Sequence, residues 1–180
     1  MIKNIAVFCA SAMPQNAIYR EAATELGTLL AKKGKSIVYG GASVGLMDAL
    51  ASAALQNGGQ VTGVITEFLA DKEIAKTNCT KLIVAKNMSE RKTKILEIAD
   101  AVIALPGAFG TMDELFETLT LVHLNLYNVP VGLLNTNGYF NLLLDFLDKM
   151  ASEQFLQHKH LQTLTVASSV ETLLNKMTIL

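Results

Sequence analysis

The chain has 180 residues, of which 51% are hydrophobic and 17% charged, and its formal net charge is −1. This length suits one domain with a sizeable core, and the composition excludes a disordered chain. The charge balance gives no electrostatic basis for binding nucleic acid, and the apolar runs are too short and interrupted for a membrane span. Cys9 and Cys79 form neither a CxxC motif nor a disulfide framework, which predicts a reducing cytoplasm.

Apolar runs of strand length alternate with helical periodicity along the whole chain. The predicted strands are residues 5–9, 36–39, 61–65, 81–85, 101–105, 131–134 and 163–166, and the predicted helices are residues 16–33, 46–57, 90–99, 112–126, 139–150 and 170–177. Several strands are continuous Val, Ile and Leu runs, which are typical of strands buried on both faces of a parallel sheet. The order predicts one α/β domain over residues 1–180: a doubly wound, Rossmann-like, mostly parallel sheet with helices on both faces.

The loop over residues 40–45 reads Gly-Gly-Ala-Ser-Val-Gly and joins a strand to a helix. Its glycines and the helix start can hold a phosphate, or they can simply make a tight turn. A phosphate-binding Walker loop needs Lys-Ser/Thr directly after its last glycine, and this chain has Leu46 and Met47 there, which excludes that motif. Ala42 stands at the third position of the dinucleotide fingerprint G-x-G-x-x-G, where a glycine is needed. A nucleotide-dependent oxidoreductase is therefore only a minor alternative, although Glu67 is spaced like a ribose-binding acid.

Residues 88–92, Met-Ser-Glu-Arg-Lys, open the helix after the fourth predicted strand. Ser89 is expected to be the N-cap of this helix. Arg91 and Lys92 fit ordinary surface positions. The planar guanidinium of Arg91, however, suits phosphate or ribose hydroxyls, and it is expected at the end of the sheet where ligands bind.

Residues 105–114 form the most informative loop, because they end a buried strand and begin a helix. Pro106 stiffens the exit, the glycines expose backbone N–H groups, and Thr111 offers a hydroxyl at the helix start, a combination that suits a phosphate. Asp113 and Glu114 are expected in the first turn, where a carboxylate can stabilise the helix dipole without any chemistry. Composition alone does not separate the two acids.

The predicted helix over residues 112–126 is apolar around most of its circumference. Leu115, Phe116 and Leu119 lie on one stripe, whereas Leu121 and Leu124 fall on the opposite side. Such a helix must be covered on both sides. Two layers of one domain can do this, and so can a partner subunit.

Together these motifs resemble those of the LOG family, the cytokinin riboside 5′-monophosphate phosphoribohydrolases, also labelled lysine-decarboxylase-like. The family pattern PGGxGTxxE corresponds to residues 106–114, and the arginine motif, commonly MHERK, corresponds to residues 88–92. Shorter matches occur at residues 7–9, 38–41, 45–47, 63–65, 99–101 and 130–135. The resemblance covers nearly the whole chain and weakens after about residue 150.

The resemblance implies a hydrolase that cleaves the N-glycosidic bond of a purine nucleoside 5′-monophosphate, AMP or an N6-substituted AMP, without cofactor or metal. It implies a homodimer, for which we expect the 112–126 helix in the interface. Arg91 and Glu114 match the family's catalytic pair. The expected substrate-binding residues are Gly41, Gly45, Glu73, Lys92, Gly107, Ala108, Phe109, Gly110, Thr111, Asp113 and Thr120. Decarboxylase chemistry would need pyridoxal phosphate on a lysine with a pyridinium partner, which the sequence does not indicate.

The chain departs from the family pattern at a few positions. Ala42 and Ala108 replace glycines, which is harmless where φ is negative and disruptive where φ is positive. Ser89 replaces a histidine, and Leu121 stands where relatives often carry tryptophan, so the sequence leaves preference for an N6-prenylated base open. The altered glycines also support an alternative function, a nucleotide-binding regulatory module with little or no turnover.

Overall fold

The computed structural model describes residues 2–72 and 74–179, and within these residues one sheet of seven parallel strands forms the centre of the fold. The strands are β1 (Asn4–Phe8), β2 (Ser36–Tyr39), β3 (Val61–Thr66), β4 (Lys81–Ala85), β5 (Ala101–Ala104), β6 (Val131–Leu134) and β7 (Leu164–Ala167). Their order is β4-β3-β2-β1-β5-β6-β7. The predicted Rossmann-like α/β fold is therefore confirmed, and the strand order reverses between β1 and β5.

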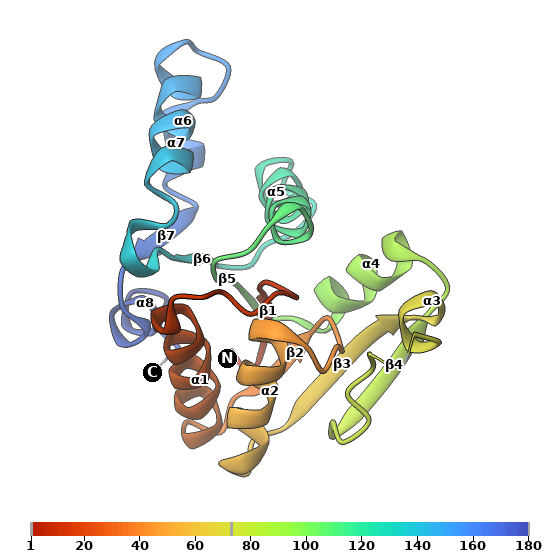
Figure 1. The fold of residues 1–180 in the computed structure, drawn as a ribbon. Coiled ribbons are helices and arrows are strands. Elements are labelled where there is room, and N and C mark those ends of the chain that lie inside the picture. Colours follow the sequence, from red (N-terminus) through yellow and green to blue (C-terminus); the bar gives the residue numbers. More distant parts are fainter. Residues whose placement is uncertain (1, 73, 180) are drawn as a thin grey trace.

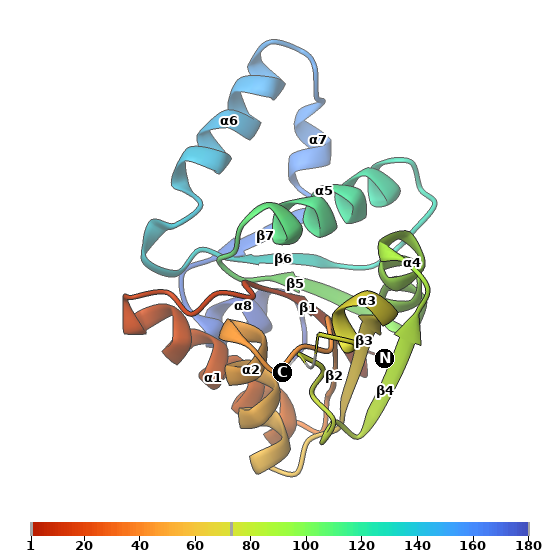
Figure 2. The same ribbon diagram turned by 45° about the vertical axis from the view of Figure 1, so that its right-hand side comes forward.

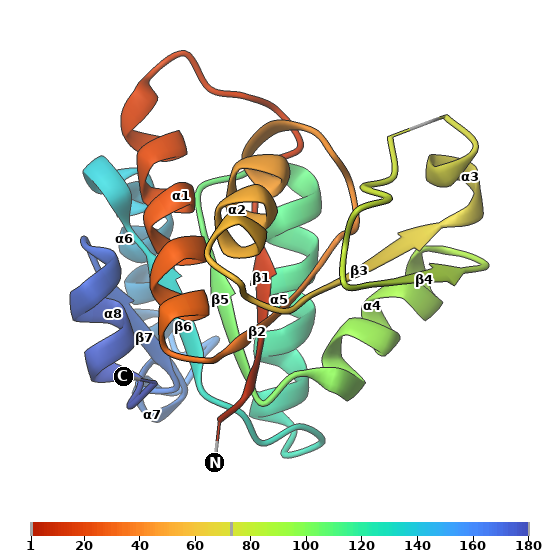
Figure 3. The same cartoon turned by 90° about the horizontal axis from the view of Figure 1, so that it is seen from below.

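Helices cover both faces of this sheet. They are α1 (Ala17–Lys32), α2 (Gly45–Gln56), α3 (Glu67–Ala70), α4 (Met88–Ile98), α5 (Phe109–His123), α6 (Asn141–Ser152), α7 (His158–Leu161) and α8 (Val170–Lys176), with a 3₁₀ turn, η1, at Thr136–Gly138. Helices α1, α2 and α8 pack on one face, where α1 and α2 lie side by side, and α4 and α5 pack on the other (Figures 1 and 3). Helices α6 and α7 extend beyond the sheet as an arm on the α5 side (Figure 2).

The core has two layers because the strands alternate their side chains between the two faces. In β1, Ile5 and Val7 join the layer under α1 and α2, whereas Ala6 and Phe8 join the layer under α4 and α5. These side chains are almost completely buried. Burial on both faces explains why the strands read as continuous apolar runs.

Several predicted helix boundaries were wrong. Helix α5 begins at Phe109 and ends at His123, so Asp113 and Glu114 lie in its second turn and its first turn holds no acid. Helix α4 begins at Met88, and its N-cap is Asn87, whose side chain accepts a hydrogen bond from Glu90 N at 2.9 Å. Ser89 is therefore not the cap. The short helices α3 and α7 were not predicted.

None of the helices in residues 2–72 and 74–179 is long and apolar enough to cross a membrane.

Candidate active site

A cavity of about 210 Å³ lies at the carboxyl ends of β1, β2 and β5. It is enclosed by the loops that follow these strands and by residues of α2, α3, α4 and α5. Parallel sheets of this order bind ligands where the strand order reverses, and β1 and β5 are the two strands at that point. The cavity is therefore in the position that the fold favours for a ligand.

Arg91 and Glu114 form a buried ion pair at this cavity. Arg91 comes from the first part of α4 and Glu114 from the second turn of α5, and their side chains join at 2.9 Å between Nη1 and Oε1. The Nε of Arg91 also donates to the carbonyl oxygen of Val64 on β3, at 2.9 Å. Arg91 is 6% exposed and Glu114 is 8% exposed, and both side chains line the cavity. The structure thus brings together the two residues predicted to be catalytic.

The protonation of Glu114 is set by two opposing effects. Burial raises the pKa of the Glu114 carboxyl above its usual value, because desolvation disfavours the charged form. The charge and the hydrogen bond of Arg91 lower this pKa, but they do not cancel the effect of burial. A carboxyl group with a raised pKa beside a cavity is typical of a functional site.

The start of α5 forms one wall of the cavity. Its N-cap, Ala108, has no side chain that can accept a hydrogen bond from the first helical N–H groups. Ala108, Gly110 and Thr111 all line the cavity. A Cβ built on Gly107 would lie 2.0 Å from Oγ1 of Thr111, so the threonine side chain covers the bare Cα of this glycine. Uncapped N–H groups and a hydroxyl at a helix start suit an anion.

The glycines of the loop after β2 serve the packing of the site. Gly41 has φ +75° and Gly45 has φ +59°, a region that side chains disfavour. A Cβ on Gly45 would meet the carbonyl oxygen of Ser11 at 2.3 Å, so the loop after β1 packs directly on this glycine. Neither Gly41 nor Gly45 lines the cavity, whereas Gly40 does, with the Arg91 guanidinium against its Cα.

Four other predicted binding residues are not part of the cavity lining: Gly107, Lys92, Phe109 and Asp113. Lys92 donates to Asp113 at 2.9 Å and also contacts Glu117, in a cluster between α4 and α5. Phe109 is 93% exposed. For these residues, binding to substrate remains a prediction.

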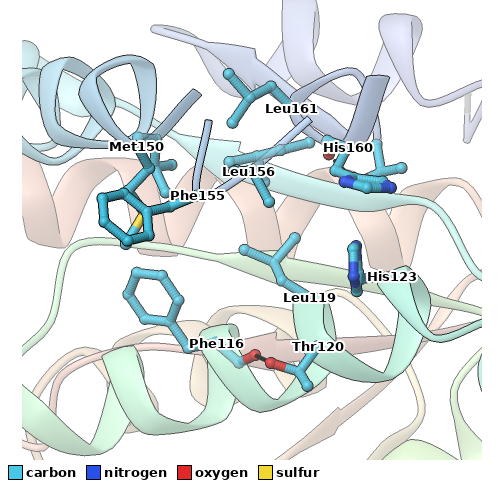
Figure 4. Close-up of a pocket in the computed structure, with 12 residues that line it drawn as sticks. Phe116, Leu119, Thr120, His123, Met150, Phe155, Leu156, His160 and Leu161 are labelled. Atoms are coloured by element: carbon cyan, nitrogen blue, oxygen red, sulfur yellow. Dashed lines mark hydrogen bonds between the residues drawn. The ribbon is translucent and has the colours of Figure 1, made fainter. Parts of the chain in front are cut away.

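The remaining two predicted binding residues are Thr120 and Glu73. Thr120 lies on another side of α5, where its hydroxyl donates to Phe116 O and its side chain borders an apolar groove (Figure 4). Glu73 lies outside the described residues. Both assignments therefore remain predictions.

The cavity also includes residues that the sequence analysis did not assign to the site. The loop after β1, including Cys9, Ser11 and Ala12, forms part of its wall, and Met47 and Leu69 add apolar surface. These residue types carry no recognisable chemical motif. Their position beyond the carboxyl end of β1 is the one signal that could have indicated the loop after this strand.

The fold and the cavity define a Rossmann-like α/β protein with a candidate anion-binding active site at the switch in strand order. A family model described as "Possible lysine decarboxylase" matches residues 47–177. The chain is 39% identical over 175 residues to a cytokinin riboside 5′-monophosphate phosphoribohydrolase of Arabidopsis thaliana, covering 97% of this chain and 82% of that protein. A second Arabidopsis protein of that name is 37% identical over 175 residues, covering 97% and 77%. The chain belongs to this LOG, or lysine-decarboxylase-like, family.

Solved structures share the fold at lower identity. A molybdenum cofactor binding protein from the phototrophic bacterium Rippkaea orientalis superposes with a TM-score of 0.74 at 22% identity, covering 99% of this chain and 96% of that protein. At this identity the similarity shows the fold alone, and function has to be argued from the site.

Proposed function

We propose that this protein hydrolyses the N-glycosidic bond of a purine nucleoside 5′-monophosphate, AMP or an N6-substituted AMP, to the free base and ribose 5-phosphate. The observation that carries the proposal is the buried Arg91–Glu114 pair, which shares its cavity with the uncapped start of α5. The names of the two Arabidopsis relatives support the same chemistry. The test is incubation with AMP, GMP, CMP and N6-isopentenyl AMP, followed by chromatography for free base and ribose 5-phosphate.

In the proposed reaction, water adds to C1′ of the ribose and the bond from C1′ to the base nitrogen breaks, with its electron pair leaving on the base. The water loses one proton and the base gains one, so that the products are ribose 5-phosphate and the neutral base. The transition state resembles an oxocarbenium ion, so negative charge beside C1′ lowers the barrier. The Glu114 carboxylate supplies this charge or orients the water. Arg91 uses one N–H for Glu114 and another for Val64 O, which leaves further donors for ribose hydroxyls or phosphate. The first turn of α5 anchors the 5′-phosphate, which holds C1′ at Glu114.

The alternative of a binding module without turnover rested on the altered glycines Ala42 and Ala108. Ala108 has φ −102°, and Ala42 is not among the described non-glycine residues with positive φ. Neither alanine therefore strains the backbone, and this argument for lost activity falls away. A binding protein also has less need of a buried pair such as Arg91–Glu114, so the hydrolase remains our proposal.

The decarboxylase description of the family would imply pyridoxal phosphate, which enzymes hold through a lysine Schiff base. Among the described residues that line the cavity, none is a lysine. Lys92 turns to Asp113 and Glu117, and Lys76 pairs with Asp48 at 2.7 Å. The residues of the cavity therefore do not fit this cofactor, and no step of the proposed reaction uses it.

We expect AMP to be hydrolysed and adenosine to be a poor substrate, because the start of α5 is arranged for an anion. Steady-state kinetics with the two substrates measures this difference as a ratio of kcat/KM. Equal values for AMP and adenosine would remove the first turn of α5 from its proposed role.

We also propose that the protein is a homodimer. An apolar groove of about 260 Å³ runs between α5 and the arm, with Phe116 and Leu119 on one side and Leu156 and Leu161 on the other (Figure 4). Among the described residues that line this groove, none is Asp, Glu, Lys or Arg. Phe155 at its edge is 87% exposed. A mostly apolar groove with an exposed phenylalanine at its edge favours a protein partner, and the family resemblance indicates a second copy of this chain.

The dimer makes a direct prediction for light scattering. At micromolar concentration, the protein should scatter with twice the mass of the chain, and Phe155→Ser should shift it towards the monomer because a large apolar contact is lost. Phe68→Ser is the matched control, since Phe68 is 66% exposed but lies on α3, away from the groove. A monomeric parent, or equal dissociation of both variants, would contradict the proposed interface.

A further inference from the structure

Tyr139 lies between β6 and the arm, and its hydroxyl contacts the loop that joins β5 to α5. This hydroxyl donates to the carbonyl oxygen of Gly107 at 2.8 Å. Gly107 is the first glycine of the segment over residues 106–111, which we call the phosphate loop. We propose that Tyr139 is a positioning residue that holds the phosphate loop in its anion-binding conformation. The proposal rests on the function proposed above and adds a residue to it.

The turn before α6 fixes where Tyr139 is placed. Asn135 accepts a hydrogen bond from Phe140 N at 2.8 Å and donates to the Asn141 side chain at 2.8 Å. The Tyr139 ring packs edge-on against Phe140 and against Tyr19 of α1, with ring centroids 4.9 and 5.7 Å apart. The tyrosine is thus held through both its backbone and its ring before the hydroxyl makes its bond.

The geometry of the peptide group shows what this bond controls. In a planar trans peptide, the C=O of Gly107 and the N–H of Ala108 point in opposite directions. A donor that fixes the Gly107 carbonyl therefore also fixes the direction of the Ala108 N–H, and Ala108 lines the cavity. Gly107 lacks the Cβ that restricts other residues, so this peptide is especially free to rotate without such a bond.

A second bond holds the other side of the phosphate loop. The carbonyl oxygen of Pro106 accepts a hydrogen bond from Ala10 N, in the loop after β1, at 3.3 Å. Two successive carbonyl groups of the loop are thus held by separate segments of the chain. The Ala10 bond is a backbone bond that only substitution by proline would remove, whereas the Tyr139 bond depends on one side-chain oxygen.

The test variant is Tyr139→Phe, which removes the hydroxyl and keeps the ring contacts. Tyr139 is 47% exposed, so the variant leaves no closed cavity, and loss of one hydrogen bond should lower its unfolding temperature by only a few degrees. Loss of one hydrogen bond should weaken binding of ribose 5-phosphate about tenfold and raise the KM for AMP by a similar factor. The kcat for AMP and the kcat/KM for adenosine, which carries no phosphate, should change less than about twofold.

Tyr19→Phe is the matched control, because it removes a hydroxyl from the neighbouring ring of the same aromatic cluster. The backbone amide resonance of Ala108 should shift in Tyr139→Phe and stay in place in Tyr19→Phe. Unchanged affinity for ribose 5-phosphate in Tyr139→Phe would overturn the role of Tyr139 and leave the proposed function standing. Equal losses for AMP and adenosine would also overturn it, since they would indicate a general structural defect. A parent protein that releases no base from any nucleotide would instead refute the proposed function.

Discussion

Glu114→Gln is expected to lower the turnover of AMP a hundredfold or more, roughly 3 kcal/mol in the barrier. The amide keeps the volume of the side chain and can still accept the hydrogen bond from Arg91, so the fold should persist. It lacks the negative charge that stabilises an oxocarbenium-like transition state. Affinity for AMP, measured by calorimetry, should change little because the phosphate loop is untouched.

Asp113→Asn is the matched control for this variant. Asp113 precedes Glu114 on the same helix, but adjacent helical residues point more than a quarter-turn apart. Asp113 pairs with Lys92 and is exposed, whereas Glu114 is buried at the cavity. The loss of turnover in Asp113→Asn should therefore be far smaller. Equal turnover by the two variants would show that Glu114 is a structural charge, and the proposed mechanism would lose its central residue.

The dependence of kcat/KM on pH is a second test of the role of Glu114. Because burial raises the pKa of Glu114, protonation should remove the required carboxylate at a higher pH than for an ordinary glutamate. The acidic limb of kcat/KM for AMP should therefore lie above 4.5, the ordinary value of this carboxyl. Activity is expected to fall as the pH drops through that limb, and the residual activity of Glu114→Gln should lack the limb.

The sheet could be predicted from the sequence because its strands are buried on both faces and read as continuous apolar runs. The ends of helices were harder, since boundary signals are local and compete. Asn87 is followed three residues later by Glu90, the spacing of a capping box, and this spacing identifies Asn87 better than Ser89. Gly110 made the first turn of α5 look like loop, although a glycine is tolerated within a helix at modest cost.

The site was predictable only in part. That Arg91 and Glu114 lie in the same site could be predicted from the family motifs and from the rule that ligands bind beyond the carboxyl ends of parallel strands. The sequence could not show that Lys92 and Asp113 pair with each other, because that depends on how α4 and α5 pack. Tyr139 gave no signal either, since its partner is a backbone carbonyl 32 residues away.

Arg91→Met is expected to cost about 3–5 kcal/mol of folding free energy near neutral pH, because it leaves the Glu114 carboxylate buried without its partner. Methionine has an apolar side chain of similar length and fills much of the space. Urea unfolding of the parent and the variant measures the difference. Lys92→Met is the control, since its partners Asp113 and Glu117 keep 55% and 36% of their side-chain surface exposed and neither carboxylate is left fully buried, and it should cost clearly less than Arg91→Met.

The destabilisation of Arg91→Met should depend on pH in a direction set by Glu114. Its folded-state pKa is already raised by burial, and loss of Arg91, which lowers that pKa, raises it further. A raised pKa means that the folded state holds the proton after the unfolded chain has lost it. Stability therefore falls as the pH rises from about 4.5, the ordinary value, through the folded-state pKa. The gap between variant and parent should be smallest at acid pH and largest above this window.

The double variant Arg91→Met/Glu114→Gln separates the charge from the packing. With no carboxylate left to desolvate, it should be more stable than Arg91→Met near neutral pH, and its difference from the parent should no longer grow with pH. A part of the loss should persist at every pH, because Val64 O loses the hydrogen bond from Arg91 Nε. The double variant should be at least as inactive towards AMP as Glu114→Gln, because it also loses the donors that Arg91 offers to the substrate. If Arg91→Met were equally destabilised at acid and neutral pH, the pair would act through packing alone, and Glu114 would not be held in the fold as a buried charge.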